Sequence, residues 1–302
     1  MKRLLVLGSV VALVGAVGLF GATAKGSRQG GPLRVVAAEN FWGSIAAQLG
    51  GTRVQVTSVI TNPATDPHSY EPTAVDARAV AGAEMVIENG IGYDPWARKL
   101  VDANPESGRV VLDVGDLVGI KPGGNPHRWY SPANVNEVIR AITSDYSKLD
   151  PKDAAYFNRR QAQFEARGLA GYRKWIATIR RQYRGIPVGA SESIFAPLAH
   201  ALALNLITPA SFLKAISEGT EPTAADRTTI DRQIAGKQIK VWVYNSQNST
   251  PDVARITDAA RKRGVPVTTI TETLFPASAS FQAWQVRQLK ALAAALHAAT
   301  GR

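Results

Sequence analysis

The sequence predicts an α/β protein of two lobes, each a small parallel sheet covered by helices, joined by one long rigid α-helix. Strand-like apolar runs alternate with helical segments in residues 33–147, and the same alternation returns in residues 184–302. Between them, residues 148–183 carry apolar side chains at helical spacing and no strand-like run. A chain of 302 residues is long enough to bury a core in each lobe.

The N-terminus has the three-part layout of a secretory signal peptide, residues 1–24. A basic pair precedes an apolar run at 4–20, and small residues form a cleavage pattern that ends at Ala24. We expect cleavage after Ala24, a linker at 25–32, and a mature protein that is periplasmic or secreted. An uncleaved anchor is the alternative, because the apolar run approaches the length of a membrane span.

Composition excludes several classes of protein and site. The chain has no cysteine, so it has no disulfide, no thiolate metal site, no cysteine nucleophile, and no cysteine after the leader that could carry a lipid. The net charge of +11 is scattered over the sequence rather than gathered in a basic stripe with aromatic residues. We therefore expect no nucleic-acid binding.

In the first lobe, residues 33–147, strands are expected where short apolar runs lie between turn signals. Gly50 and Gly51 end the first helix, and Thr73 provides a cap for the second. The expected elements are strands at 33–38, 54–60, 85–88 and 110–114, and helices at 41–49, 73–81 and 95–103.

The linking helix is assigned to residues 148–183. After Pro151 the chain continues to about Tyr183 without another proline, and large apolar residues recur at helical spacing. At 1.5 Å per residue such a helix is on the order of 45 Å long, more than one lobe needs. We expect a spine between two lobes; a helical hairpin broken at Gly168 or Gly171 is the alternative.

The second lobe, residues 184–302, repeats the alternation of strands and helices. Strands are expected at 186–190, 239–244 and 265–271, and helices at 194–204, 251–263 and 281–299.

Two look-alike loops, residues 66–72 and 125–132, each place a histidine directly behind a proline. In each loop an aromatic residue follows the histidine by two positions and a second proline closes the segment. Proline fixes its own φ and restricts the residue before it, so His68 and His127 lie on stiffened loops that suit a preorganised metal site. Two ordinary turns with surface histidines are the alternative.

Four metal-binding side chains come just after predicted strands. His68 and His127 follow strands of the first lobe, and Glu192 and Glu272 follow strands of the second. Ligands of open α/β sheets bind beyond the carboxyl ends of the strands, so the four side chains converge if the sheets face each other. Two imidazole nitrogens and two to four carboxylate oxygens suit Mn²⁺ or Fe²⁺, whereas a closed zinc site usually has four ligands rich in His or Cys. Affinity alone favours zinc over manganese.

The other histidines are weaker candidates for this site. His200 lies in an apolar helical segment, and His297 lies near the C-terminus. Glu192 and Glu272 also have a simpler interpretation as ordinary carboxylates, and Glu192 in particular lies where a helix dipole would stabilise it.

With these residues in place, the chain resembles the periplasmic solute-binding proteins of zinc and manganese ABC importers, known as cluster A-I. The resemblance covers nearly the whole mature chain. It rests on the long central helix and on three motifs: Asp-Pro-His-Ser-Tyr-Glu-Pro at 66–72, Asn-Pro-His-Arg-Trp at 125–129, and Thr-Glu-Thr-Leu at 271–274.

The resemblance implies one metal between two lobes, held by His68, His127, Glu192 and Glu272. The third ligand of the family is usually a histidine in zinc carriers and often a glutamate in manganese carriers, and the fourth is usually an aspartate. This chain has glutamate at both positions and lacks the histidine-rich loop that many zinc carriers have before His127. We therefore expect Mn²⁺, with Zn²⁺ next and Fe²⁺ third, as the transported ligand.

The same resemblance implies a monomer that is not an enzyme and that delivers its metal to an ABC permease and its ATPase. A secreted metallohydrolase is an alternative, but the sequence has no His-Glu-x-x-His motif. A surface adhesin on the same fold is a further alternative.

Overall fold

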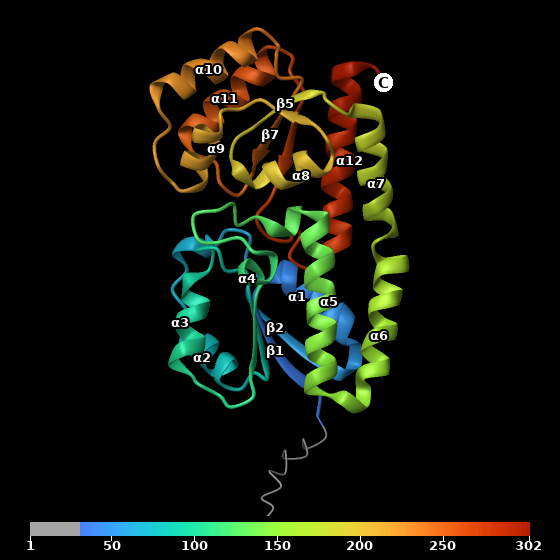
Figure 1. The fold of residues 1–302 in the computed structure, drawn as a ribbon. Helices are drawn as coiled ribbons and strands as arrows, with labels where there is room; N and C mark the ends of the chain where they lie inside the picture. The colour runs from blue at the N-terminus through green and yellow to red at the C-terminus, as the bar shows by residue number, and fades with distance from the viewer. Residues whose placement is uncertain (1–30) are drawn as a thin grey trace, which may run out of the picture. The chain divides into compact units, whose positions relative to one another are not determined.

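The computed structural model describes residues 31–302, and the predicted signal peptide lies outside them. Two parallel four-stranded sheets, one in each lobe, are covered by helices, which confirms the predicted fold class (Figure 1). The strand orders are β2-β1-β3-β4 in the first sheet and β6-β5-β7-β8 in the second. The strands are β1 Leu33–Glu39, β2 Val54–Ile60, β3 Met85–Glu88, β4 Val110–Asp113, β5 Pro187–Ala190, β6 Asn205–Leu206, β7 Val241–Asn245 and β8 Val267–Ile270.

The first sheet is buried on both faces because its strands carry apolar residues on both sides. Val35 and Ala37 of β1 point into one core and Val36 into another, as the two-residue period of a strand requires. Helices α1 and α5 pack on the first face, and α2 and α3 on the second. The helices of this lobe are α1 Asn40–Gly50, α2 Ala74–Ala81, α3 Pro95–Ala103, α4 Val114–Val118 and α5 Pro132–Leu149.

The second sheet follows the same plan. In β7, Val241 and Val243 join the core that the two lobes share, whereas Trp242 points to the opposite face and packs among α9, α10 and α11. The helices of this lobe are α8 Ala196–Ala201, α9 Ala210–Ser217, α10 Ala224–Ala235, α11 Pro251–Lys262 and α12 Phe281–Thr300.

The predicted linking helix is a helical run with an interruption. Helix α5 ends at Leu149, and the chain then turns into α6, Ala154–Gln163. A π-helical turn at Phe164–Gly168 and non-helical Leu169 separate α6 from α7, Ala170–Tyr183. The chain keeps its direction through this turn, so it does not form a hairpin at Gly168 (Figure 1). The domain boundaries at 147 and 183 stay a prediction.

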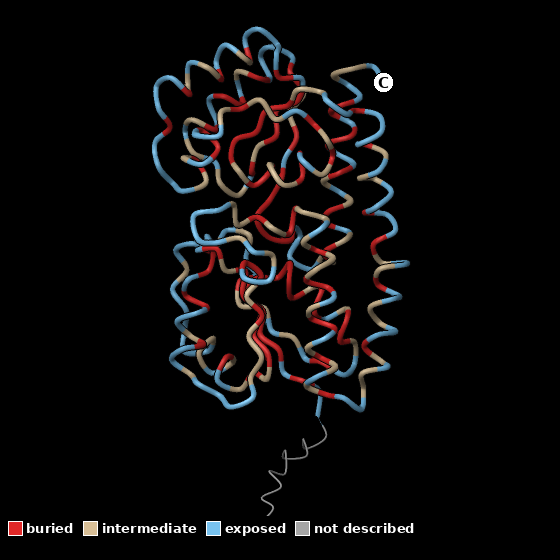
Figure 2. Tube along the Cα trace, viewed as in Figure 1, coloured by how far each residue is buried: buried red, intermediate tan, exposed pale blue. Residues whose placement is uncertain are grey.

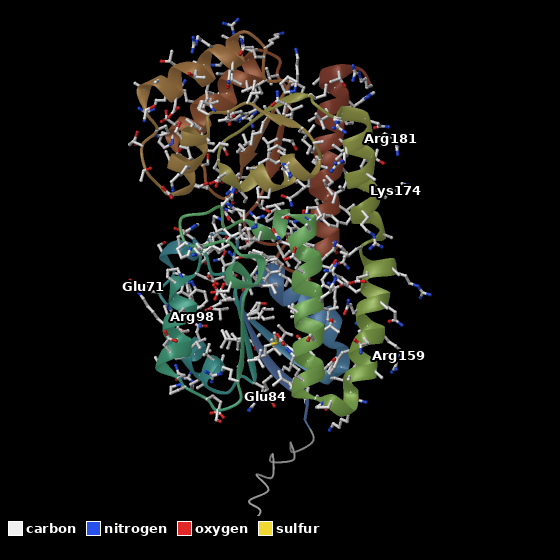
Figure 3. The ribbon with its side chains drawn as sticks, viewed as in Figure 1. Glu71, Glu84, Arg98, Arg159, Lys174 and Arg181 are labelled. Carbon is white, nitrogen blue, oxygen red and sulfur yellow. The ribbon has the colours of Figure 1, made fainter. Side chains whose placement is uncertain are left out.

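Burial follows the sheets and the inner faces of the helices (Figure 2). One apolar core runs from the first lobe through α5, α6 and α7 into the second lobe. At its centre Phe41 stacks on Trp129 with ring centroids 4.1 Å apart, and both side chains are fully buried. On the opposite side of the linking run, Arg159, Lys174 and Arg181 point outward (Figure 3).

Five elements were not predicted from the sequence. They are the long helix α5 and the shorter elements α4, β6, α9 and α10. The last predicted strand is also shorter than expected and ends at Ile270, so that Thr271 and Glu272 lie in a loop. Within residues 31–302, no helix is long and apolar enough to cross a membrane.

The stacked pair at the centre of the core gives a stability prediction. We expect Phe41→Ala to lower the free energy of unfolding by about 3–5 kcal/mol, because it leaves a cavity that the neighbouring rings cannot fill. Urea denaturation of the metal-free protein measures the change. The control is Val75→Ala, at a side chain that is 63% exposed, which we expect to stay within about 0.5 kcal/mol of the parent protein. Equal losses in both variants would contradict the role of the stack.

Candidate metal site

The two histidine loops hold their imidazoles in the same way. Asp66 Oδ1 accepts from the backbone N–H of His68 at 3.0 Å and lies 3.1 Å from its Nδ1. Asn125 Oδ1 does the same for His127, at 3.0 Å and 2.9 Å. Since each oxygen is an acceptor, Nδ1 of each ring is the protonated nitrogen and donates. Nε2 is then the nitrogen of each ring that can bind a metal, once it has given up any proton it carries.

The carboxylate of Asp66 is itself held in the charged form. Burial opposes ionisation, but hydrogen bonds from the backbone of His68 and the hydroxyl of Ser69 lower the pKa of Asp66. An ionised Asp66 makes the His68 ring a stronger base and a better ligand.

Aromatic rings fix the positions of the two imidazoles. His68 lies edge-on to Tyr93 with ring centroids 4.7 Å apart, and its side chain is 37% exposed. His127 is 1% exposed and lies edge-on to Trp129 at 5.3 Å and to Tyr93 at 6.0 Å. The site therefore has one deeply buried imidazole and one that faces solvent.

Glu272 is the carboxylate that both lobes share. Tyr93 of the first lobe donates its hydroxyl hydrogen to Oε2 at 2.9 Å, and Asn245 at the end of β7 donates to Oε1 at 2.8 Å. Oε2 also lies 3.6 Å from Nε2 of His127. Burial by itself would raise the pKa of Glu272, but the charge and hydrogen bond of His127, with Tyr93 and His68, bring it below its ordinary value.

Glu192 lies at the other side of the site and is 1% exposed. Asn248 donates to its Oε2 at 3.0 Å, Ser217 lies at 3.5 Å from the same oxygen, and Oε1 has no hydrogen-bond partner. Burial, together with the charge of Glu272, raises the pKa of Glu192 to about 8. Although Glu192 precedes a short helical turn, its side chain makes no capping hydrogen bond there, so it is not an ordinary helix cap.

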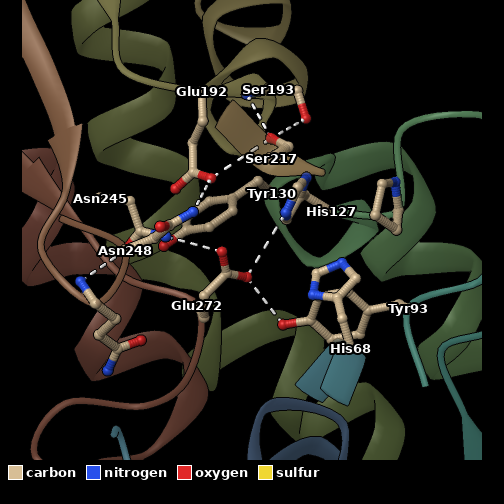
Figure 4. Close-up of polar contacts among 12 residues, drawn as sticks. His68, Tyr93, His127, Tyr130, Glu192, Ser193, Ser217, Asn245, Asn248 and Glu272 are labelled. Atoms are coloured by element: carbon tan, nitrogen blue, oxygen red, sulfur yellow. Dashed lines mark hydrogen bonds and ion pairs between the residues drawn. The ribbon is translucent and has the colours of Figure 1, made fainter. Parts of the chain in front are cut away.

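The four predicted side chains lie in the same region between the lobes, although Glu192 lines neither of the two cavities there (Figure 4). A cavity of about 270 Å³ is lined by His68 and Glu272, and a second of about 300 Å³ by His68 and His127. His127 and Glu272 are in contact, whereas His68 and Glu192 stand further apart. Within residues 31–302, no three histidine or carboxylate side chains already stand at metal-ligand spacing. If these four side chains hold one cation, they have to draw together to bind it.

Comparison with known proteins identifies the family. The profile of the family described as zinc-uptake complex component A, periplasmic, matches residues 35–295. The chain belongs to this family. It is thus a periplasmic metal-binding component of a metal ABC transporter.

Curated relatives of this zinc-uptake family member are named for different metals. A manganese-binding lipoprotein of Halalkalibacterium halodurans is 27% identical over 66% of this chain and 67% of its own length. An iron-binding protein of Yersinia pestis is 30% identical over 38% of this chain and 39% of its own. A zinc-binding lipoprotein of Streptococcus pneumoniae is 23% identical over 81% of this chain and 52% of its own. The names alone do not choose among the three metals.

Solved structures share the fold. A periplasmic zinc-binding protein from Treponema pallidum superposes with a TM-score of 0.72 at 19% identity, covering 88% of this chain and 99% of that one. A manganese-bound periplasmic metal-binding protein from Candidatus Liberibacter asiaticus gives a TM-score of 0.72 at 18% identity, covering 87% and 98%.

Four residues that contact the predicted ligands were not found from the sequence. They are Tyr93, Ser217, Asn245 and Asn248. Two of them had a usable signal, because Tyr93 follows β3 and Asn245 ends β7, at the same sheet edges as the histidines and carboxylates. His200 and His297 are exposed on α8 and α12 and take no part in the site.

A further carboxyl is buried in the first lobe without any hydrogen bond. Glu39, the last residue of β1, is fully buried, and neither of its oxygens has a partner. Burial, followed by the charges of Asp94, Glu88 and Glu272, raises its pKa well above the ordinary value of 4.5. Glu39 therefore keeps its proton to a higher pH in the folded protein than in the unfolded chain.

The raised pKa of Glu39 makes the free energy of unfolding depend on pH. Above pH 4.5 the unfolded chain loses this proton and the folded protein keeps it, so the contribution of Glu39 to stability falls as pH rises. We expect Glu39→Gln to stabilise the metal-free protein more at pH 8 than at pH 5. Urea denaturation at both pH values measures this, with Glu71→Gln at an exposed position as the control. A gain that is the same at both pH values would mean that Glu39 is not protonated.

Proposed function

We propose that this protein captures a divalent transition metal between its lobes and delivers it to the membrane permease of an ABC importer, which an ATPase drives. His68, His127, Glu192 and Glu272 are the proposed ligands. The observation that carries the proposal is that each histidine loop holds Nδ1 against an acceptor oxygen, which leaves Nε2 as the nitrogen for a metal, while Oε2 of Glu272 lies 3.6 Å from Nε2 of His127.

The charge of the site supports a divalent ion as the cargo. Two carboxylates neutralise one divalent cation, so the cost of burying that ion between the lobes is small. Without the metal, burial and then repulsion by the charge of Glu272 raise the pKa of Glu192 to about 8. A bound cation would remove that repulsion.

The four proposed ligands can offer a metal either six or four donor atoms. If each carboxylate gives both oxygens, the site offers six donors and favours Mn²⁺. If Asn245 and Asn248 keep one oxygen of each carboxylate, it offers four donors, as a closed zinc site does. We propose Mn²⁺ as the cargo, with Zn²⁺ next and Fe²⁺ third, on the strength of the two glutamates. A monomeric state is part of the same proposal.

The ligand assignment has a direct test. We expect His68→Ala and His127→Ala each to weaken metal binding by at least about a hundredfold, because loss of a ligand costs no less than loss of a residue that supports one. Competitive titration against a fluorescent chelator measures the affinity. His200→Ala, at an exposed histidine on α8, is the matched control and should bind as the parent protein does. Full affinity in both ligand variants would reject the site.

The identity of the metal has a separate test. We expect protein purified from its native compartment to carry manganese, and the metal-free form to take up Mn²⁺ in a competitive titration with Zn²⁺. Elemental analysis of the purified protein and the titration check this together. Preferential retention of zinc in the native sample would replace manganese by zinc while leaving the four ligands in place.

A further inference from the structure

The two histidine loops differ at the residue that holds the imidazole. The first has an aspartate, Asp66, and the second an asparagine, Asn125. Each offers one side-chain oxygen to the backbone N–H and the Nδ1 of its histidine, so for that task the two residues are equivalent. Asn125 differs in having an NH₂ group, which can also donate.

The NH₂ group of Asn125 reaches across to the second lobe. Its Nδ2 donates to the backbone carbonyl of Ser193 at 2.7 Å. The orientation of the amide follows from its partners, since the N–H of His127 is a donor and the carbonyl of Ser193 is an acceptor. An aspartate at this position would turn an oxygen towards that carbonyl and repel it.

The position of Ser193 gives this hydrogen bond its importance. Ser193 directly follows Glu192, the carboxylate that the second lobe brings to the site. Other hydrogen bonds between the lobes, from Tyr93 to Glu272 and from Tyr130 to Thr271, end on the loop after β8. The bond of Asn125 instead reaches the junction between β5 and α8.

The same bond lies in the wall of a cavity. Asn125, His127 and Ser193 all line the space of about 300 Å³ beside the site. Asn125 is partly exposed, so water can replace its NH₂ group if the Glu192 segment moves away. The contact can therefore open and close without unfolding either lobe.

We propose that Asn125 is a positioning residue that latches the two lobes together at the metal. Its oxygen sets the tautomer of His127, and its NH₂ group holds the Glu192 segment against the first lobe. The latch therefore keeps His127 and Glu192 together at the metal. The latch rests on the proposed metal-binding function. It adds one expectation, that metal is released faster when the hydrogen bond from Asn125 to Ser193 is lost.

Asn125→Asp tests the latch because two effects predict opposite results. The aspartate keeps the oxygen that accepts from His127 and loses the donor to Ser193. Its added negative charge, acting alone, would hold a cation more tightly and slow release. Loss of the latch predicts that Zn²⁺ is released into excess chelator about tenfold faster, which corresponds to one lost hydrogen bond.

The matched control makes the same chemical change nearby. Asn134 Oδ1 accepts hydrogen bonds from Arg128, and Asn134→Asp keeps that acceptor while adding one negative charge to the same lobe. We expect its release rate to stay within about twofold of the parent protein. X-ray absorption of the zinc-loaded Asn125→Asp variant should still show two nitrogen ligands and carboxylate oxygen, and the rate of zinc uptake should be unchanged.

Each outcome decides one of the two proposals. Release from Asn125→Asp at the parental rate or slower would overturn the latch, because the added charge would then be acting alone. If that variant does not fold, Asn125→Ser serves instead, since a serine hydroxyl can accept from the N–H of His127 but is too short to reach Ser193. A parent protein that binds no zinc or manganese would reject the proposed function rather than the latch.

Discussion

The hydrogen bonding of the buried Glu272 carboxylate is the interaction on which the rest of the site depends. A charge in a protein interior is tolerated only when hydrogen bonds and opposite charges replace its water. Here the replacements come from both lobes, with Tyr93 on one oxygen and Asn245 on the other. The need to satisfy this one group therefore ties the first sheet to the end of β7.

The backbone on both sides of Glu272 is also held by hydrogen bonds. Tyr130 donates to the carbonyl of Thr271, the N–H of Thr271 donates to Gln288, and Asn40 accepts from the N–H of Leu274. Glu192 has a looser setting, because its donors are two side chains of its own lobe and one of its oxygens has none. The site thus combines two imidazoles of the first lobe, one carboxylate held by both lobes and one held by the second lobe alone. That asymmetry is why a single contact at Asn125 can matter.

The sequence predicted the parts of the site that follow from local chemistry. The prolines before His68 and His127 identified the loops, and the ends of the strands identified Glu192 and Glu272. The amide donors Asn245 and Asn248 were missed because asparagine after a strand is common in ordinary turns. Helices α9 and α10 were missed because their stretch is rich in Thr, Ser and Pro, and their packing against Trp242 is visible only in three dimensions. The π-helical turn in the linking run was not predicted because it depends on contact: a side chain on Gly168 would meet the ring of buried Phe164 at 2.7 Å.

The last helix has a consequence for when the site is completed. Gln288 and Trp284 of α12 fix Thr271, and Gln282 exchanges two amide hydrogen bonds with Gln48 of α1, near the other end of the chain. These contacts cannot form before α12 itself has been made. Glu272 therefore gains its final position only after the ribosome has made the C-terminal helix. A nascent chain that carries both histidines still lacks the finished pocket, and premature capture of metal during synthesis is disfavoured.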